Sequence, residues 1–198
     1  MSTPLPFVWP YALAFWLVYI WAFSPEFRIL KRTPLRGTPA PVEDQGSARV
    51  VVIGGSLVML LSFVIALLAR RAKLPGDPRV WFVVGVLALI AGSLLRRHCF
   101  KVLGRFFTGA VTIQSDHRVI DSGAYRWVRH PSYSAALLMT LGIGLSLGNW
   151  LSVLISIVGA FPIYTYRARV EERALLSALG APYADFLAKR KRFIPFIV

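Results

Sequence analysis

The chain has 198 residues, of which 56% are hydrophobic and 16% are charged, and its formal net charge is +14 at pH 7. This composition is too apolar for an ordinary soluble domain, so it indicates an integral membrane protein. The basic residues flank apolar runs, as cationic anchors at lipid headgroups do, so we expect membrane lipids as partners and no nucleic acid.

Apolar runs follow one another along the chain and predict the membrane-spanning helices. A spanning helix needs about 20 residues and tolerates roughly 17 to 25, so the last two runs are short but sufficient. Only Gly148 and Asn149 separate those two, and this turn signal predicts an antiparallel hairpin. We therefore expect an all-α, polytopic membrane protein with about five transmembrane helices, at 7–23, 50–69, 80–95, 133–147 and 150–166.

The distribution of lysine and arginine predicts how these helices are oriented, because basic residues concentrate on the cytoplasmic side. None precedes the first run, four lie in 24–48, seven in 96–130 and seven from 167 onward. Five spans place these three basic regions together, opposite the N-terminus. Four basic residues in 70–79 oppose this orientation and are outnumbered. We expect a multi-pass protein of the cell inner membrane, with its catalytic face in the cytoplasm.

The most informative stretch is 123–133, which reads Gly-Ala-Tyr-Arg-Trp-Val-Arg-His-Pro-Ser-Tyr and stands directly before the fourth run. Arg126 and Arg129 supply fixed positive charge that attracts a carboxylate or phosphate. Tyr125 and Tyr133 offer aromatic faces for an adenine ring or a sulfonium cation. Crowding such groups against a bilayer is costly, so the stretch indicates a working site.

A second polar cluster follows the fifth run. Arg167 and Glu171 are one helical turn apart and share a helix face. The hairpin brings this cluster to the same side of the membrane as 123–133. Glu171 and Glu172 add negative charge suited to an ammonium group or ribose hydroxyls, so the joint pocket suits a zwitterionic ligand. The alternative is that these residues only anchor helices in the headgroup region, which we favour for single arginines but not for the full cluster.

Other chemistry finds little support in the residues. No nucleophile elbow, Walker loop or dinucleotide-binding glycine pattern is evident. The single cysteine, Cys99, excludes an internal disulfide and any multi-cysteine metal site, and we expect no metal. A group transfer from an activated donor needs little beyond binding and alignment, which fits this inventory. Gly142 and Gly144 favour close helix packing over approach of a ligand.

At these residues the chain resembles the isoprenylcysteine carboxyl methyltransferase family, within a wider group that includes phospholipid N-methyltransferases. The stretch 125–133 is similar to the family's Arg-His-Pro-x-Tyr signature, and the tail keeps the family's order with Arg167, Glu171, Glu172, Leu175, Gly180, Tyr183, Pro195 and Phe196. The resemblance covers about 103–196. It divides the chain into N-terminal transmembrane helices one to three (1–102) and a methyltransferase-like catalytic region (103–198), which holds the hairpin of helices four and five and a cytoplasmic tail.

The resemblance implies that S-adenosylmethionine binds in a C-terminal cytoplasmic pocket. It implies Arg167 and Glu171 as catalytic residues, and Arg167 with Arg129 as the residues that bind the acceptor. It implies cofactor contacts from Gln114, His117, Arg118, Val119, Ile120, Tyr125, His130, Pro131, Ser132, Tyr133, Glu171 and Glu172. With five spans where the animal enzyme has eight, the chain looks like the short microbial form.

The function implied is methyl transfer to a lipophilic small-molecule or prenylated acceptor, most simply the carboxylate of an isoprenylcysteine-like substrate. A carboxylate is already anionic and needs no general base. Phospholipid amine N-methylation is the first alternative, and it would need a base such as Glu172. A sterol-reductase-like enzyme using NADPH and a non-enzymatic membrane protein are the others. The sequence indicates neither the natural acceptor nor the oligomeric state.

Overall fold

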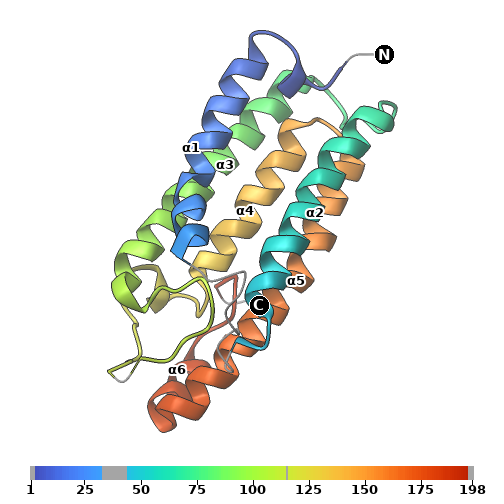
Figure 1. Ribbon diagram of the computed structural model, residues 1–198. Coiled ribbons are helices and arrows are strands. Elements are labelled where there is room, and N and C mark those ends of the chain that lie inside the picture. Colours follow the sequence, from blue (N-terminus) through green and yellow to red (C-terminus); the bar gives the residue numbers. More distant parts are fainter. Residues whose placement is uncertain (1–2, 33–43, 115, 196–198) are drawn as a thin grey trace.

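The structure is a computed structural model in which residues 3–32, 44–114 and 116–195 are described. Five long helices lie side by side in an elongated bundle (Figure 1). They are α1 (Tyr11–Arg32), α2 (Ser47–Leu68), α3 (Pro78–Leu103), α4 (Pro131–Ser146) and α5 (Trp150–Leu179); α6 (Ala181–Lys189) and the short 3-10 helices η1 (Leu5–Phe7), η3 (Gly104–Phe106) and η4 (Gly123–Arg126) complete the described helices. The described residues contain no strand, only isolated bridges. Phe196, named above, lies outside them, as does one of the four basic residues counted in 24–48.

Three of the described helical segments are long and apolar enough to cross a membrane: Ser47–Leu68, Pro78–Phe106 and Trp150–Leu179. The prediction of an all-helical membrane protein is confirmed to that extent. The other two long helices have visible reasons to fall short. α1 contains Pro25 and Glu26 as well as polar aromatic residues, and α4 has only 16 residues.

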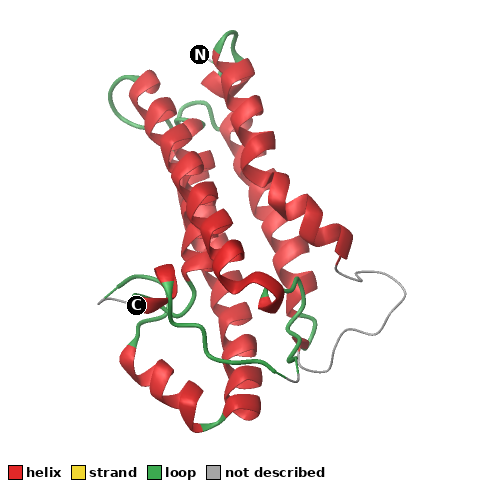
Figure 2. Ribbon diagram, turned by 90° about the vertical axis from the view of Figure 1, so that its left-hand side faces the viewer, coloured by secondary structure: helices red, strands yellow, loops and turns green. Residues whose placement is uncertain are grey.

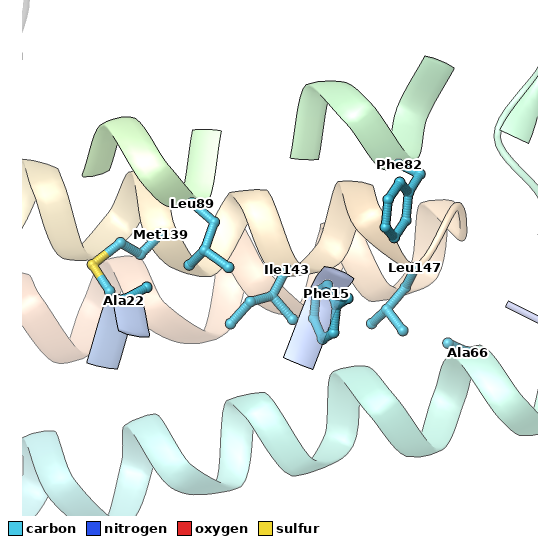
Figure 3. Packing of buried hydrophobic residues seen from close by; sticks show 8 residues of the cluster. All are labelled: Phe15, Ala22, Ala66, Phe82, Leu89, Met139, Ile143 and Leu147. Carbon is cyan, nitrogen blue, oxygen red and sulfur yellow. The ribbon is translucent and has the colours of Figure 1, made fainter. Parts of the chain in front are cut away.

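α3 and α4 pack with their backbones almost in contact. A Cβ atom added to Gly142 would lie 2.6 Å from the carbonyl oxygen of Gly85, and one added to Gly85 would lie 2.5 Å from that of Gly142. Small residues allow such approach in membrane helices, so the packing interpretation of Gly142 is confirmed. Beside this contact the side chains of Leu89, Met139 and Ile143 meet those of α1 in the buried core (Figure 3).

The predicted hairpin is present. α4 ends at Ser146, Gly148 adopts a positive φ of 64°, and the Asn149 side chain accepts hydrogen bonds from the backbone N–H groups of Leu151 and Ser152 at the start of α5. The helix ends differ from the apolar runs, however, because α3 continues to Leu103 and α5 to Leu179. These two helices continue through the charged residues that follow their apolar runs. Hydropathy therefore predicts the length of the apolar span and not the residue at which the helix ends.

The chain after α5 folds back onto the end of the bundle opposite the N-terminus (Figure 2). α6 packs there through the buried side chains of Tyr183 and Phe186. Residues 190–193, which we call the C-terminal strap, then run beside the start of α4. The N–H groups of Arg129 and His130 donate to the carbonyls of Lys191 (2.9 Å) and Arg192 (3.0 Å). The strap therefore fixes the backbone that precedes α4.

Candidate active site

A pocket open to solvent lies at this end of the bundle. Its wall comes from the N-terminal part of α2, the segment 103–120, the start of α4, the middle of α5 and α6. The hairpin was predicted to bring the stretch 123–133 together with Arg167 and Glu171, and residues of both clusters line this pocket. Most of the predicted residues line the pocket: His117, Arg118, Val119, Ile120, Tyr125, Arg129, His130, Ser132, Tyr133, Arg167 and Glu171.

Three predicted residues are placed elsewhere. Gln114 is not at the wall; its side-chain amide donates to the backbone carbonyl of Arg105 (2.8 Å). Pro131 is buried as the first residue of α4, where its fixed φ suits a helix start. Glu172 is buried behind the wall, on the side that faces the C-terminal strap. The sequence could not separate these positions from the wall because neighbours in a motif point in different directions.

Glu172 holds the strap to the site. Its carboxylate accepts hydrogen bonds from Arg192 at 2.7 and 3.2 Å and lies 3.1 Å from His130 Nε2. Arg129 Nε adds a cation 3.4 Å away. Because two arginines and His130 surround the Glu172 carboxylate, Glu172 contacts His130 and the strap and does not line the pocket.

Glu171 instead faces the pocket. Its side chain retains 30% of its exposure, and its Oε2 accepts a hydrogen bond of 2.5 Å from the Tyr133 hydroxyl. The His130 ring stacks on the Tyr133 ring, with 5.1 Å between centroids and 9° between planes. The site therefore presents a carboxylate that is held in place at one oxygen and open to a ligand.

Arg167 is buried and held by several groups. Its Nε donates to the Tyr133 hydroxyl (3.3 Å), its Nη1 to the Asp44 carboxylate and to Ser47 Oγ, and its Nη2 to the carbonyl of Gly109 (3.0 Å). A guanidinium group has five N–H donors. These contacts use four of them, so within the described part of the chain one N–H on Nη2 remains for a ligand.

Asp44, the counter-ion of Arg167, was not among the predicted residues. It is 1% exposed and also accepts hydrogen bonds from the N–H groups of Val111 (2.8 Å) and Ala48 (3.1 Å). Burial alone would raise the pKa of Asp44, but these two backbone bonds and the charge of Arg167 outweigh it and lower the pKa. The only signal was an acidic residue near the start of a predicted helix, which is ordinary.

A second ion pair, which is partly buried, was also missed. Arg96 Nη2 donates to Glu26 of α1 (3.0 Å), and Arg96 Nη1 donates to the carbonyl and hydroxyl oxygens of Ser132 (2.8 and 2.9 Å). Arg96 and Glu26 line both the pocket and a neighbouring apolar cavity between the helices. Charged side chains inside a membrane bundle are costly. An ion pair that lines two cavities therefore indicates a functional part of the molecule.

Two polar groups of the pocket residues lack a hydrogen-bond partner among the described residues: His117 Nδ1 and Arg129 Nε, both buried. Burial lowers the pKa of His117 and so favours the neutral ring. The negative charge of Glu171 acts in the opposite direction but is the smaller effect. Unpaired buried polar atoms are costly unless a ligand or water satisfies them. Arg129 Nε lies 3.4 Å from the Glu172 carboxylate, so His117 Nδ1 is the atom of the two that a polar ligand in the pocket would satisfy.

The fold and this pocket define a helical membrane protein with a polar ligand site at one end of its bundle. The sequence model of the isoprenylcysteine carboxyl methyltransferase (ICMT) family matches residues 83–177. The chain is 30% identical over 156 residues to the probable protein-S-isoprenylcysteine O-methyltransferase of Oryza sativa subsp. indica, covering 76% of this chain and 82% of that protein. It is 29% identical to protein-S-isoprenylcysteine O-methyltransferase B of Arabidopsis thaliana, over 72% of this chain and 74% of the other.

A solved structure, that of the eukaryotic intramembrane Ras methyltransferase ICMT, has the same fold, with a TM-score of 0.66 and 24% identity. The match covers 91% of this chain but 64% of that chain. The protein belongs to the isoprenylcysteine carboxyl methyltransferase family and is a membrane methyltransferase. The resemblance read from the two sequence motifs is confirmed.

Proposed function

We propose that the protein transfers a methyl group from S-adenosylmethionine to the carboxylate of an isoprenylcysteine-like, lipophilic acceptor. Family membership carries the reaction class, and the plant relatives are named for O-methylation of isoprenylcysteine. The observation that carries the site is the pairing of an open carboxylate on Glu171 with an open arginine N–H on Arg167, both at the wall of one pocket.

The residues of the wall fit the methyl donor. S-adenosylmethionine supplies an activated methyl group on a sulfonium centre. Glu171 offers the negative charge that its ammonium group or ribose hydroxyls need, while His117 Nδ1 is an unsatisfied polar atom. The Phe106 ring lies tilted beside the His117 ring, with 4.8 Å between centroids, and adds aromatic surface to the wall. We assign donor binding to these residues and to the predicted positions at the wall, with Glu172 and Pro131 supporting them from behind.

The acceptor carboxylate is proposed to lie between Arg167 and Arg129. Arg167 has one open N–H, and the Arg129 guanidinium makes no hydrogen bond within the described residues, its ion pair with Glu172 apart. The adjoining apolar cavity is lined by residues such as Phe23, Met59 and Met139. It suits the apolar tail of the acceptor. No proton has to be removed, so orientation and charge are what the chain supplies.

We also propose that α1 and α4 cross the membrane, giving five spans. Both helices pack against α3, which is itself long enough to span. Placing α1 in the bilayer covers its exposed apolar side chains, such as Leu13, Leu17 and Ile20, and α4 follows because it packs between α3 and α5. Most of the basic residues then gather at the pocket end, and we propose on that ground that the pocket lies at the cytoplasmic face of the inner membrane.

The test is methyl transfer from S-adenosyl-L-[methyl-³H]methionine to N-acetyl-S-farnesylcysteine or to phosphatidylethanolamine, with the protein in nanodiscs. Methyl esters release labelled methanol in base, whereas N-methyl groups do not. We expect base-labile product from the first acceptor, lost in Arg167→Met and retained in Arg173→Met, an exposed arginine on the same helix. Base-stable product from the phospholipid alone would identify an amine methyltransferase. No product, and no binding of S-adenosylhomocysteine, would refute the proposal.

A further inference from the structure

The charge of the acceptor-binding arginine is already balanced by the protein. Arg167 Nη1 donates to the Asp44 carboxylate, and the side chains of Arg167 and Asp44 are 6% and 1% exposed. Asp44 lies just before α2, outside residues 83–177 that carry the family match. The arginine that is proposed to bind the acceptor carboxylate thus already forms an ion pair with Asp44 of the protein.

Asp44 is held too firmly to be displaced by an incoming carboxylate. Its Oδ1 accepts from Val111 N–H (2.8 Å) and Ser47 Oγ (3.1 Å) as well as from Arg167, and its Oδ2 accepts from Ala48 N–H (3.1 Å). Breaking these bonds in a buried place would leave several donors unsatisfied. The acceptor therefore meets Arg167 with Asp44 still bound to it, through the remaining N–H on Nη2.

The proposed reaction makes this pairing useful. A bond forms between a carboxylate oxygen and the methyl carbon, the bond from that carbon to sulfur breaks, and its electron pair stays on sulfur as a neutral thioether. The acceptor's negative charge is thereby lost on the way to the ester. A fully unpaired arginine would stabilise the charged starting state more than the transition state, and such ground-state binding slows the chemical step.

We infer that Asp44 is a positioning residue for methyl transfer: it orients Arg167 and offsets its charge, so that the acceptor carboxylate is held but stays reactive. This inference rests on the proposed function. It also assigns to the segment before α2 a part in the site that the family match does not cover.

The kinetic test compares wild type with Asp44→Asn and Asp44→Ser, two neutral residues that can still accept a hydrogen bond from Ala48 N–H. We expect KM for N-acetyl-S-farnesylcysteine and kcat both to fall, each by about three- to tenfold, so that kcat/KM changes little. A purely structural role predicts a raised KM with a lowered kcat. Asp77→Asn, which keeps the cap of α3 at the other end of the bundle, is the matched control and should match wild type.

A binding measurement gives a second readout that needs no turnover. With S-adenosylhomocysteine bound, the affinities for N-acetyl-S-farnesylcysteine and for its neutral methyl ester are compared by calorimetry. We expect the preference for the carboxylate to rise about three- to tenfold in the neutral variants. An unchanged or weakened preference overturns the inference while leaving methyl transfer by wild type intact. Failure of both variants to fold also overturns it, since Asp44 would then serve the fold.

Discussion

Glu171 and Glu172 are adjacent on α5 but have opposite surroundings, so the same isosteric change should act on different properties. Glu171 faces the pocket with a 30% exposed side chain, whereas the Glu172 side chain is 10% exposed and contacts His130 and Arg192. We predict that Glu171→Gln loses ligand affinity and keeps stability. Glu172→Gln should lose stability and keep the affinity of the molecules that remain folded.

The magnitudes follow from these contacts. Removing one partner of a buried ion pair costs about 3–5 kcal/mol, and the lower end applies because Arg192 is partly exposed. About 3 kcal/mol corresponds to a fall in Tm of roughly 6–12 °C for a chain of this size. In Glu171→Gln the amide oxygen still accepts from Tyr133. The loss of a charged hydrogen bond to S-adenosylhomocysteine, about 1.5–3 kcal/mol, weakens binding roughly 10- to 100-fold.

The assay for stability can use the chain's only thiol. Cys99 is fully buried, so a thiol-reactive dye should label it only when the protein unfolds. Calorimetric titration with S-adenosylhomocysteine measures affinity on the same samples, below the Tm of the weaker variant. Wild type and Arg173→Met serve as controls for stability and affinity.

The reasoning would be refuted by the reversed pattern, in which Glu172→Gln binds weakly at full stability and Glu171→Gln unfolds early. Equal effects of both changes on both properties would also contradict it. Either result would mean that the pocket wall does not separate the two carboxylates.

Three further predictions concern packing, the strap and acid. Gly142→Ala should lower the free energy of unfolding by about 1–3 kcal/mol, because the added Cβ would clash with the backbone of α3. Gly55→Ala, where the added Cβ has no atom within 4 Å, should raise it slightly, and dye-monitored melting compares the two variants. Ser134→Ala removes the 2.6 Å bond to the Phe193 carbonyl, about 1 kcal/mol, and should speed proteolysis of the strap at an unchanged global Tm. Because the pKa of Asp44 is lowered by folding, the ionised carboxylate stabilises the fold fully above its ordinary pKa of 3.8, and this contribution is lost as the pH falls below that value. The Tm of Asp44→Asn should therefore fall less than that of wild type when the pH is lowered through this range.

The sequence predicted those parts of the fold that local patterns determine. The turn at Gly148 and Asn149 is in place, because turn chemistry acts over a few residues. With the hairpin known, the meeting of Tyr133 with Glu171 follows. The family signature then supplied the reaction class.

The contributions of α1 and α2 could not be predicted in the same way. Glu26 and Asp44 are isolated acidic residues whose partners, Arg96 and Arg167, lie 70 and 123 positions away. Nothing in a local window relates such residues, because only the packing of the helices brings them together. The same holds for Glu172, whose role depends on a strap that returns from beyond α6.

The strap also has a consequence for the order of events during synthesis. The Phe193 carbonyl is bound by Ser134, 59 positions earlier, and the neighbouring strap residues pair with the backbone before α4. The backbone bond that the His130 N–H donates to Arg192 can form only after that later stretch has been translated and has folded back. A nascent chain whose helices are already in the bilayer would therefore still lack a finished pocket, and a ribosome that stalls late would leave an inserted but inert protein.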